Sequence, residues 1–351
     1  HGYLGQFRSH GLRLFVQTTQ GWQQLGTPSA FEMTPQACRW VYRHSQGLLM
    51  VRSAAEGGAM TLSLQVLEGP ALKWRASLHV ALGGDDGASA APLCWQVTRQ
   101  DEASIREVEL RPAQGSEMAL RFPQGCFVIE AVGSKGFTGV AGDEALFLDG
   151  QSRGEPFLCL DGQAAPAFAL RIIGRLIPHA DVQATEPLPQ VRLLAPSGAV
   201  STPLAAAASS ILPWFRHNAL IHYLAPRGLE QYSGGGWGTR DVCQGPLEML
   251  LAAGRTPPVR DLLLRTFSAQ NPDGDWPQWF MFFERDRAIR AGDAHGDIVF
   301  WPLVGLARYL LASGDTGLLD ERLPFFGDSE SVPLWAHVDR ALALIEARRI
   351  P

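Results

Sequence analysis

The sequence predicts a multidomain β plus α fold, in which an antiparallel β-sandwich precedes a helical part. The first observation is a series of short apolar runs over residues 1–186, alternating apolar and polar side chains and separated by turns. The second is a change to the helical period of about 3.6 over residues 213–351. Residues 187–212 lie between them and are rich in proline and alanine, which predicts a linker that can carry a short helix.

The β-sandwich is predicted from strands of a few residues each. Residues 60–66 alternate apolar and polar side chains, as a strand with one buried face does. Glycine and aspartate separate such runs, as in residues 83–87. The predicted strands are residues 12–17, 47–51, 60–66, 72–82, 94–97, 105–110, 118–122, 127–129, 146–148, 157–160 and 168–173.

The helical part is predicted from apolar side chains that recur every three or four residues. Leu303, Leu306 and Leu310 lie on one face of a helix that ends at Gly314. No strand is predicted between the helices, so an α-solenoid or an α/α toroid is expected, with a site built from its loops. The predicted helices are residues 214–224, 246–252, 259–267, 299–311 and 332–349.

Composition excludes several classes of protein. Of the 351 residues 46% are hydrophobic and 19% charged, and the net charge of -5 is not gathered into a basic block. Nucleic acid and anionic membranes are therefore not expected partners. Five cysteines without a Cys-x-x-Cys pair fit a reducing compartment, so we expect a cytoplasmic protein. The chain begins at His1 and stops at Pro351 after a helical pattern, and we expect a fragment at both ends.

Three segments combine tryptophan with charged or amide side chains, which is typical of a sugar pocket: residues 234–241, 275–280 and 295–300. Indole rings cover the apolar face of a pyranose, while arginine, aspartate and glutamine bind its hydroxyls. An ordinary structural interpretation stays open, with the tryptophans in the core, a buried Arg-Asp ion pair and a glutamine that binds loop backbone. The candidate sugar-binding residues are Trp237, Arg240, Asp241, Trp276, Gln278 and Trp279.

Asp297 is the candidate for acid chemistry, because it directly precedes the apolar run of residues 298–303. It could instead be the N-cap of the following helix. Asp293, four residues earlier, is interpreted as a loop acid. His295 has no second histidine or cysteine at ligand spacing, so no metal site is predicted. Cys243 has no evident histidine partner and is interpreted as a buried thiol.

Residues 212–220, 236–246, 274–280 and 295–297 resemble, in this order, four motifs of glycoside hydrolase family 94, the cellobiose phosphorylase family. The residues of these motifs are most similar to those of the 1,2-β-oligoglucan phosphorylase branch. The resemblance implies an N-terminal β-sandwich, a helical linker, an (α/α)6 barrel and a C-terminal jelly roll. Residues 213–351 would then supply the first half of the barrel.

The resemblance also implies roles for single residues. The family's general acid maps onto Asp297, and its sugar-binding aspartate maps onto Asp241, with Arg240 beside it. The family's phosphate ligands would lie beyond Pro351, so this chain alone is expected to be inactive. The expected substrates are a β-linked glucan oligosaccharide, with β-1,2 linkages, and inorganic phosphate. No cofactor is expected, and the full-length protein is expected to form a homodimer.

Phosphate is already an anion, so a phosphorylase needs one protein acid where an inverting hydrolase needs an acid and a base. Asp297 must then be protonated before the reaction, and burial against Phe300 and Trp301 is expected to favour this. Asp241, Trp276, Gln278 and Asp297 are expected to share one cavity.

Three alternatives stay open. One is a cellobiose- or cellodextrin-type phosphorylase, and another is an inverting hydrolase with Glu284 or Asp286 as the base. The third is a catalytically incomplete fragment that only binds carbohydrate.

Overall fold

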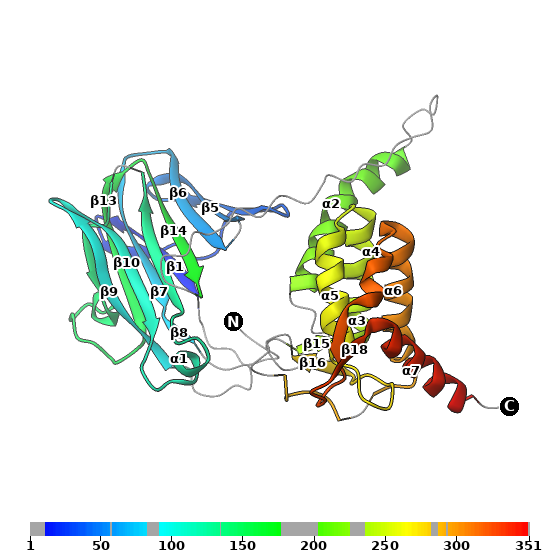
Figure 1. The fold of residues 1–351 in the computed structure, drawn as a ribbon. Helices are drawn as coiled ribbons and strands as arrows, with labels where there is room; N and C mark the ends of the chain where they lie inside the picture. The colour runs from blue at the N-terminus through cyan, green and yellow to red at the C-terminus, as the bar shows by residue number, and fades with distance from the viewer. Residues whose placement is uncertain are drawn as a thin grey trace. The chain divides into compact units, whose positions relative to one another are not determined.

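The structure is a computed structural model that describes residues 11–56, 58–82, 91–133, 135–176, 203–224, 236–281, 287–292 and 294–349. Its chain divides into two compact units, His1–Glu186 and Pro187–Pro351 (Figure 1). Each unit has a hydrophobic core of its own, and each is described by itself.

The first unit is a sandwich of two antiparallel sheets. Five strands follow the order β12-β13-β7-β1-β2, and nine follow the order β3-β4-β5-β6-β14-β11-β10-β9-β8. Val16 and Leu158 of the first sheet and Leu49, Leu64 and Leu170 of the second are buried in one core cluster, so the sheets pack face to face. The strands are β1 (Leu12–Thr18), β2 (Gly21–Gln24), β3 (Ala30–Met33), β4 (Ala37–His44), β5 (Gly47–Glu56), β6 (Ala59–Glu68), β7 (Leu72–His79), β8 (Ala81–Leu82), β9 (Ala91–Asp101), β10 (Ser104–Pro112), β11 (Cys126–Val132), β12 (Gly139–Ala141), β13 (Phe157–Ala165) and β14 (Ala167–Arg175).

Most of the predicted strands are confirmed, and two are wrong. Of residues 118–122 all but the last, the C-cap Phe122, fall in helix α1 (Glu117–Arg121), because the Ser116 side chain accepts a hydrogen bond from Ala119 N and caps the helix. Residues 146–148 follow the 3-10 helix η1 (Asp143–Leu146), and Leu148 is fully exposed, so its apolar side chain marks no strand. Strands β2, β3, β4 and β12 were not predicted.

Two glycines face each other where β5 begins and β6 ends. Gly47 has φ +127° and Gly69 has φ +120°, backbone angles that favour glycine. A Cβ on Gly47 would lie 1.9 Å from Glu68 O, and one on Gly69 would lie 2.1 Å from Gln46 O. The close approach of the two backbones therefore needs glycine at both positions.

The second unit consists mainly of helices around a second core (Figure 1). The predicted apolar face of residues 259–267 is confirmed, since Val259, Leu262, Leu263 and Thr266 are buried. The helices are α2 (Pro203–Leu224), α3 (Thr239–Cys243), α4 (Gly245–Ala252), α5 (Thr256–Ser268), α6 (Phe300–Ser313), the 3-10 helix η3 (Thr316–Asp320) and α7 (Leu334–Ala347).

The helical unit differs from the prediction in two ways. It is not free of strands, since β15 (Gly236–Gly238) pairs with β16 (Trp279–Met281), and β17 (Arg322–Pro324) pairs with β18 (Ser331–Pro333). The predicted boundary at residue 212 falls inside α2, which continues through Pro213. The alanine-rich run before it favours helix, in agreement with the short helix that the linker was predicted to carry.

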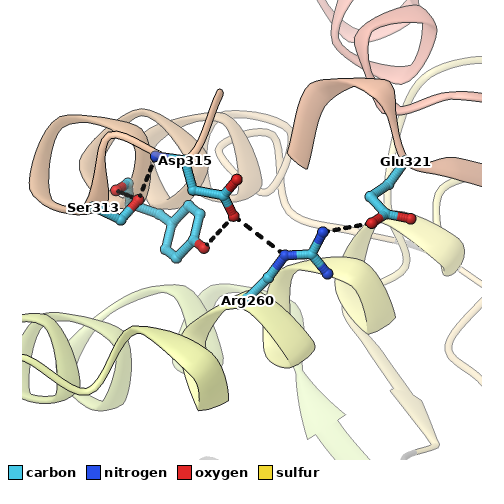
Figure 2. A network of polar contacts seen from close by, with 5 residues as sticks. Arg260, Ser313, Asp315 and Glu321 are labelled. Carbon is cyan, nitrogen blue, oxygen red and sulfur yellow. Dashed lines mark hydrogen bonds and ion pairs between the residues drawn. The ribbon is translucent and has the colours of Figure 1, made fainter. Parts of the chain in front are cut away.

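A polar network joins α5 to the end of α6 and to the start of β17 (Figure 2). Arg260 donates from Nε to Asp315 Oδ2 over 3.2 Å and from Nη2 to Glu321 Oε1 over 2.5 Å. Tyr309 donates its hydroxyl proton to Asp315 Oδ2 over 2.7 Å, and Asp315 N donates to Ser313 Oγ over 3.1 Å. These contacts hold the elements that follow the candidate site.

No helix within the described ranges is both long and apolar enough to cross a membrane.

Candidate functional site

A short antiparallel ribbon brings two of the three predicted site segments together. In it Trp237 pairs with Phe280 and Gly238 with Trp279. Just beyond, Thr239 N donates to Gln278 O over 3.0 Å, and Thr239 Oγ1 donates to Pro277 O over 2.6 Å. The start of α3 is therefore fixed to the residues that precede β16.

Arg240 connects this ribbon to the third segment. Its Nη1 donates to Asp297 Oδ2 over 3.3 Å, and Trp301 Nε1 donates to the same oxygen over 3.1 Å. The side chains of Arg240 and Asp297 are 34% and 48% exposed, so the pair lies at the surface of the unit. Helix α6 begins without a side-chain cap. The Asp297 carboxylate therefore accepts from Arg240 and Trp301 and does not cap the helix.

The expectation that burial keeps Asp297 protonated is wrong in this structure. The hydrogen bond from Trp301 lowers the pKa of Asp297 most. Burial, the next largest effect, raises it, and the hydrogen bond and charge of Arg240 lower it further, so the pKa lies below its ordinary value. Phe300, expected to cover the carboxyl, is itself 46% exposed. Asp297 is therefore a carboxylate here, with two donors on one oxygen.

Gln278 also reaches the third segment. Its Oε1 accepts a hydrogen bond from His295 N over 3.1 Å, two residues before Asp297. The side chain is half-buried. Gln278 thus holds the loop that leads to Asp297, which is the role of a loop hydrogen-bonder that the sequence left open.

Asp241 lies at the third position of α3, and its carboxylate folds back over Gly238. A Cβ on Gly238 would lie 2.0 Å from Asp241 Oδ2, so this position of the side chain requires glycine at residue 238. An acid at the third helical position that reaches back toward the N-cap is a common way to start a helix. Arg240, the expected partner of Asp241, pairs with Asp297 instead.

Two of the three candidate tryptophans lie in the core. Trp276 is fully buried, donates from Nε1 to Thr266 O over 2.8 Å and meets Phe267 edge to face at 5.4 Å. Trp237 is 5% exposed and meets Phe280 at 6.2 Å. Neither offers a ring face to a sugar in this structure. Trp279 is half-buried and keeps the stacking role open.

A hollow of about 390 Å³ lies beside the Asn271–Asp275 turn. Arg348 and Asp275 form an ion pair at its wall, with 2.5 Å between Nη1 and Oδ2. Of the four residues expected to share one cavity, it contains Trp276 alone. Its lining is Asn271, Asp273, Asp275, Trp276, Pro277, Gly292, Ala294 and Arg348.

Of the remaining candidates, the structure describes Cys243 and His295. Cys243 is fully buried, and burial raises the pKa of its thiol well above the ordinary range, as expected for an inert buried thiol. His295 is exposed, and across the described part of the chain no cluster of three or more His, Cys, Asp or Glu could hold a metal ion. Asp293, Glu284 and Asp286 lie outside the described residues.

Sequence reasoning missed two polar contacts that organise this region. One is the indole of Trp301 on Asp297, which the i, i+4 spacing ahead of a helix could have suggested. The other is a buried contact between Gln270 and His337, with 2.7 Å between Oε1 and Nδ1. Its partners are 67 residues apart, and neither belongs to a motif, so no local pattern pointed to it.

Comparison with known proteins shows what the first unit is similar to. Residues 1–174 match the family model of the glycoside phosphorylase supersandwich domain. The two-sheet sandwich described above occupies these residues. Over these residues the chain is similar to glycoside phosphorylases, in agreement with the resemblance predicted from the sequence.

A particular relative extends the similarity to both units. The chain is 29% identical over 366 residues to the 1,2-beta-oligoglucan phosphorylase of Listeria innocua, which covers 98% of this chain. The chain spans about a third of that relative, 32% of its length. Among solved structures, a polysaccharide lyase covers 47% of this chain at 9% identity with a TM-score of 0.29, a likeness too weak to carry an argument.

Proposed function

We propose that this chain is part of an inverting glycoside phosphorylase that acts on β-linked glucan oligosaccharides, with β-1,2 linkages, and on inorganic phosphate. The observation that carries the proposal is the similarity to a 1,2-beta-oligoglucan phosphorylase over 98% of the chain. The helical unit would form the first half of an (α/α)6 barrel. The Arg240–Asp297 pair and the ribbon beside it would then lie at the sugar-binding end.

The reaction needs a proton on the leaving oxygen and a nucleophile on the opposite face of the sugar. A phosphate oxygen attacks C1 as the bond from C1 to the glycosidic oxygen breaks, and an acid gives that oxygen a proton. Inversion at C1 converts the β-glucoside into α-glucose 1-phosphate. Because phosphate already carries negative charge, no protein base is required.

In the proposed mechanism Asp297 is the acid, and it must gain a proton that the present contacts disfavour. A bound sugar would remove water from the carboxyl, and a phosphate dianion nearby would add a like charge. Both effects raise a carboxyl pKa. Arg240 would leave Asp297 for a sugar hydroxyl or for phosphate, which removes one of the two donors that favour the carboxylate.

A second role for Asp297 is favoured by the same contacts. An ionised carboxylate fixed by Arg240 and Trp301 is a good acceptor for a sugar hydroxyl. In that case the acid is another residue, and Asp297 orients the sugar ring. The lowered pKa of Asp297 supports this role, and the two roles differ in what happens when the carboxyl becomes an amide.

The test of the function is an assay on a protein that includes these residues, with β-1,2-linked oligoglucan in the presence and absence of phosphate. Glucose 1-phosphate should form only with phosphate. Release of reducing sugar without phosphate would indicate an inverting hydrolase, and glucan binding without turnover would indicate a binding module. Faster reaction with cellodextrins than with β-1,2-linked chains would overturn the proposed linkage.

A further inference from the structure

Gln270 is a buried hub at the end of helix α5. Gln270 is fully buried, and its side-chain nitrogen donates to Gly274 O over 3.0 Å and to His337 O over 3.1 Å. Its backbone carbonyl accepts from Phe326 N over 2.8 Å. A buried amide this fully bonded is costly to disturb, because each partner would be left unpaired.

His337 of α7 completes this hub. Its Nδ1 lies 2.7 Å from Gln270 Oε1 and its Nε2 lies 3.1 Å from Leu323 O. Since the Gln270 amide directs its protons at two carbonyls, its oxygen faces the ring. Both ring nitrogens therefore face acceptors, and a neutral imidazole donates either to Gln270 Oε1 or to Leu323 O. The Phe325 ring lies 4.1 Å away and Phe267 6.3 Å away, so the imidazole is enclosed by aromatic side chains.

The hub fixes the turn that leads to the candidate site. Gly274 has φ +103°, and a Cβ on it would lie 2.5 Å from Arg340 O, so the turn packs directly on the backbone of α7. Four residues further on, Gln278 accepts from His295 N and its carbonyl accepts from Thr239 N. Between them Trp276 is anchored in the core. The segment from Gly274 to Gln278 is thus held at both ends and in the middle.

We propose that Gln270 and His337 are positioning residues for the site, because they set the Gly274–Gln278 segment whose Gln278 holds the loop carrying Asp297. Neither is among the residues expected to bind the sugar. Their effect would pass through Gln278 and His295. The consequence for catalysis rests on the proposed function, whereas the positioning itself does not.

The test compares Gln270→Met, which keeps the side-chain length but removes the amide, with the wild-type chain by amide hydrogen exchange. Exchange of the Gly274 and His295 amides should become about tenfold faster or more, as expected when a buried hydrogen-bonded contact is lost. The matched control is Leu318→Ala, which empties a fully buried position in η3, outside the Gly274–Gln278 segment and without a hydrogen bond from its side chain. Measurements are made at temperatures where both variants have equal global stability.

Two further variants keep the test decisive if Gln270→Met does not fold. His337→Gln can still donate to Gln270 Oε1 and should protect both amides, while His337→Phe cannot donate and should not. Equal exchange in Gln270→Met and Leu318→Ala, or equal exchange in the two His337 variants, would overturn the proposal. In the complete protein the weakened segment should raise the KM for glucan more than it lowers kcat. Absence of phosphorolysis would refute the proposed function but leave the exchange result intact.

Discussion

Nη1 of Arg240 lies 3.3 Å from Oδ2 of Asp297 across 57 residues of sequence. The contact joins the start of α3 to the turn before α6 and, together with the larger effect of Trp301, lowers the pKa of the carboxyl expected to do the chemistry. A surface pair of similar exposure, Arg265–Asp261, lies within α5 and provides a control for each partner.

Replacement of Arg240 by Met should raise the pKa of Asp297. Arg240 is the second group, after Trp301, whose hydrogen bond lowers that pKa, and its charge contributes as well. The carboxyl titration can be followed by carbon-13 NMR. Arg265→Met, which removes the cation beside Asp261, should leave the Asp297 midpoint in place. An unchanged midpoint in Arg240→Met would show that the ion pair does not form in solution.

Asp297→Asn separates the two roles proposed for this residue. If Asp297 is the acid, phosphorolysis should fall about 10²–10⁴-fold with glucan binding largely kept, because the amide cannot give up a proton. If it accepts a sugar hydroxyl, KM should rise while kcat changes little. Steady-state kinetics of the complete protein decide between the two roles, and Asp261→Asn should behave like the wild type.

Gly238→Ala should weaken glucan binding about tenfold, the size expected when a hydrogen bond from a charged group is lost. Its Cβ would collide with the Asp241 carboxylate and displace it. Gly245→Ala is the control, because a Cβ there meets no atom within 4 Å. Titration calorimetry with β-1,2-linked oligoglucan measures both. Equal affinities in the two variants would remove Asp241 from the list of sugar ligands.

Acid should destabilise the helical unit through His337. Burial lowers the pKa of His337 below its ordinary value of 6.5, while the bond to Leu323 O raises it by less. The folded state therefore binds this proton more weakly than the unfolded chain does. The stability that results is present above the ordinary pKa and is lost as the pH falls from there toward the lowered pKa.

His337→Gln removes this titration and gives the comparison. Thermal unfolding from pH 8 to pH 5 should show a steeper loss for the wild type than for the variant. The charged groups on the elements packed around the ring bond elsewhere: Arg340 to Pro272 O, Arg290 to Ala269 O and Asn271, and Asp275 to Arg348. Parallel pH profiles would mean that His337 titrates equally in the folded and unfolded chains.

Tyr309→Phe should reduce the stability of the helical unit at neutral pH. The Tyr309 hydroxyl is the group that lowers the pKa of Asp315 most, followed by the bond from Arg260. A carboxyl with a lowered pKa stabilises the fold above its ordinary pKa of 3.8, and this contribution is lost as the pH falls through the lowered value. The difference between variant and wild type in urea unfolding should therefore shrink in acid. Arg308→Met, at the exposed pair with Glu248, is the control and should change the stability little, because surface ion pairs contribute little.

The sequence predicted elements well where one period repeats over a whole element. Residues 60–66 fall within β6, and residues 299–311 fall within α6 apart from their first residue, because a buried face repeats along each. The strand predicted for residues 118–122 is wrong because five residues are too few to distinguish the strand period of 2 from the helical period of about 3.6. The N-cap at Ser116 stabilises a helix there. The short ribbon of β15 and β16 has no alternation to detect.

The candidate site was predicted as a set of segments but not as a geometry. Motif order placed Arg240, Gln278 and Asp297 in one region, and the contacts of Arg240 with Asp297 and of Gln278 with His295 agree with that. Which tryptophan is core and which is half-exposed depends on packing against distant residues such as Thr266 and Phe280. The lowered pKa of Asp297 likewise depends in part on Arg240, a partner 57 residues away.

The facing glycines Gly47 and Gly69 limit how this sandwich can diverge. Each position is blocked by a backbone carbonyl of the facing segment, Glu68 O for Gly47 and Gln46 O for Gly69, so no change of side chain at the other position can relieve the collision. A second substitution at one of these positions therefore cannot compensate for a substitution at the other, either in evolution or in laboratory selection. In a saturation library of the β unit these two codons should return to glycine independently, which makes them fixed points for aligning distant relatives.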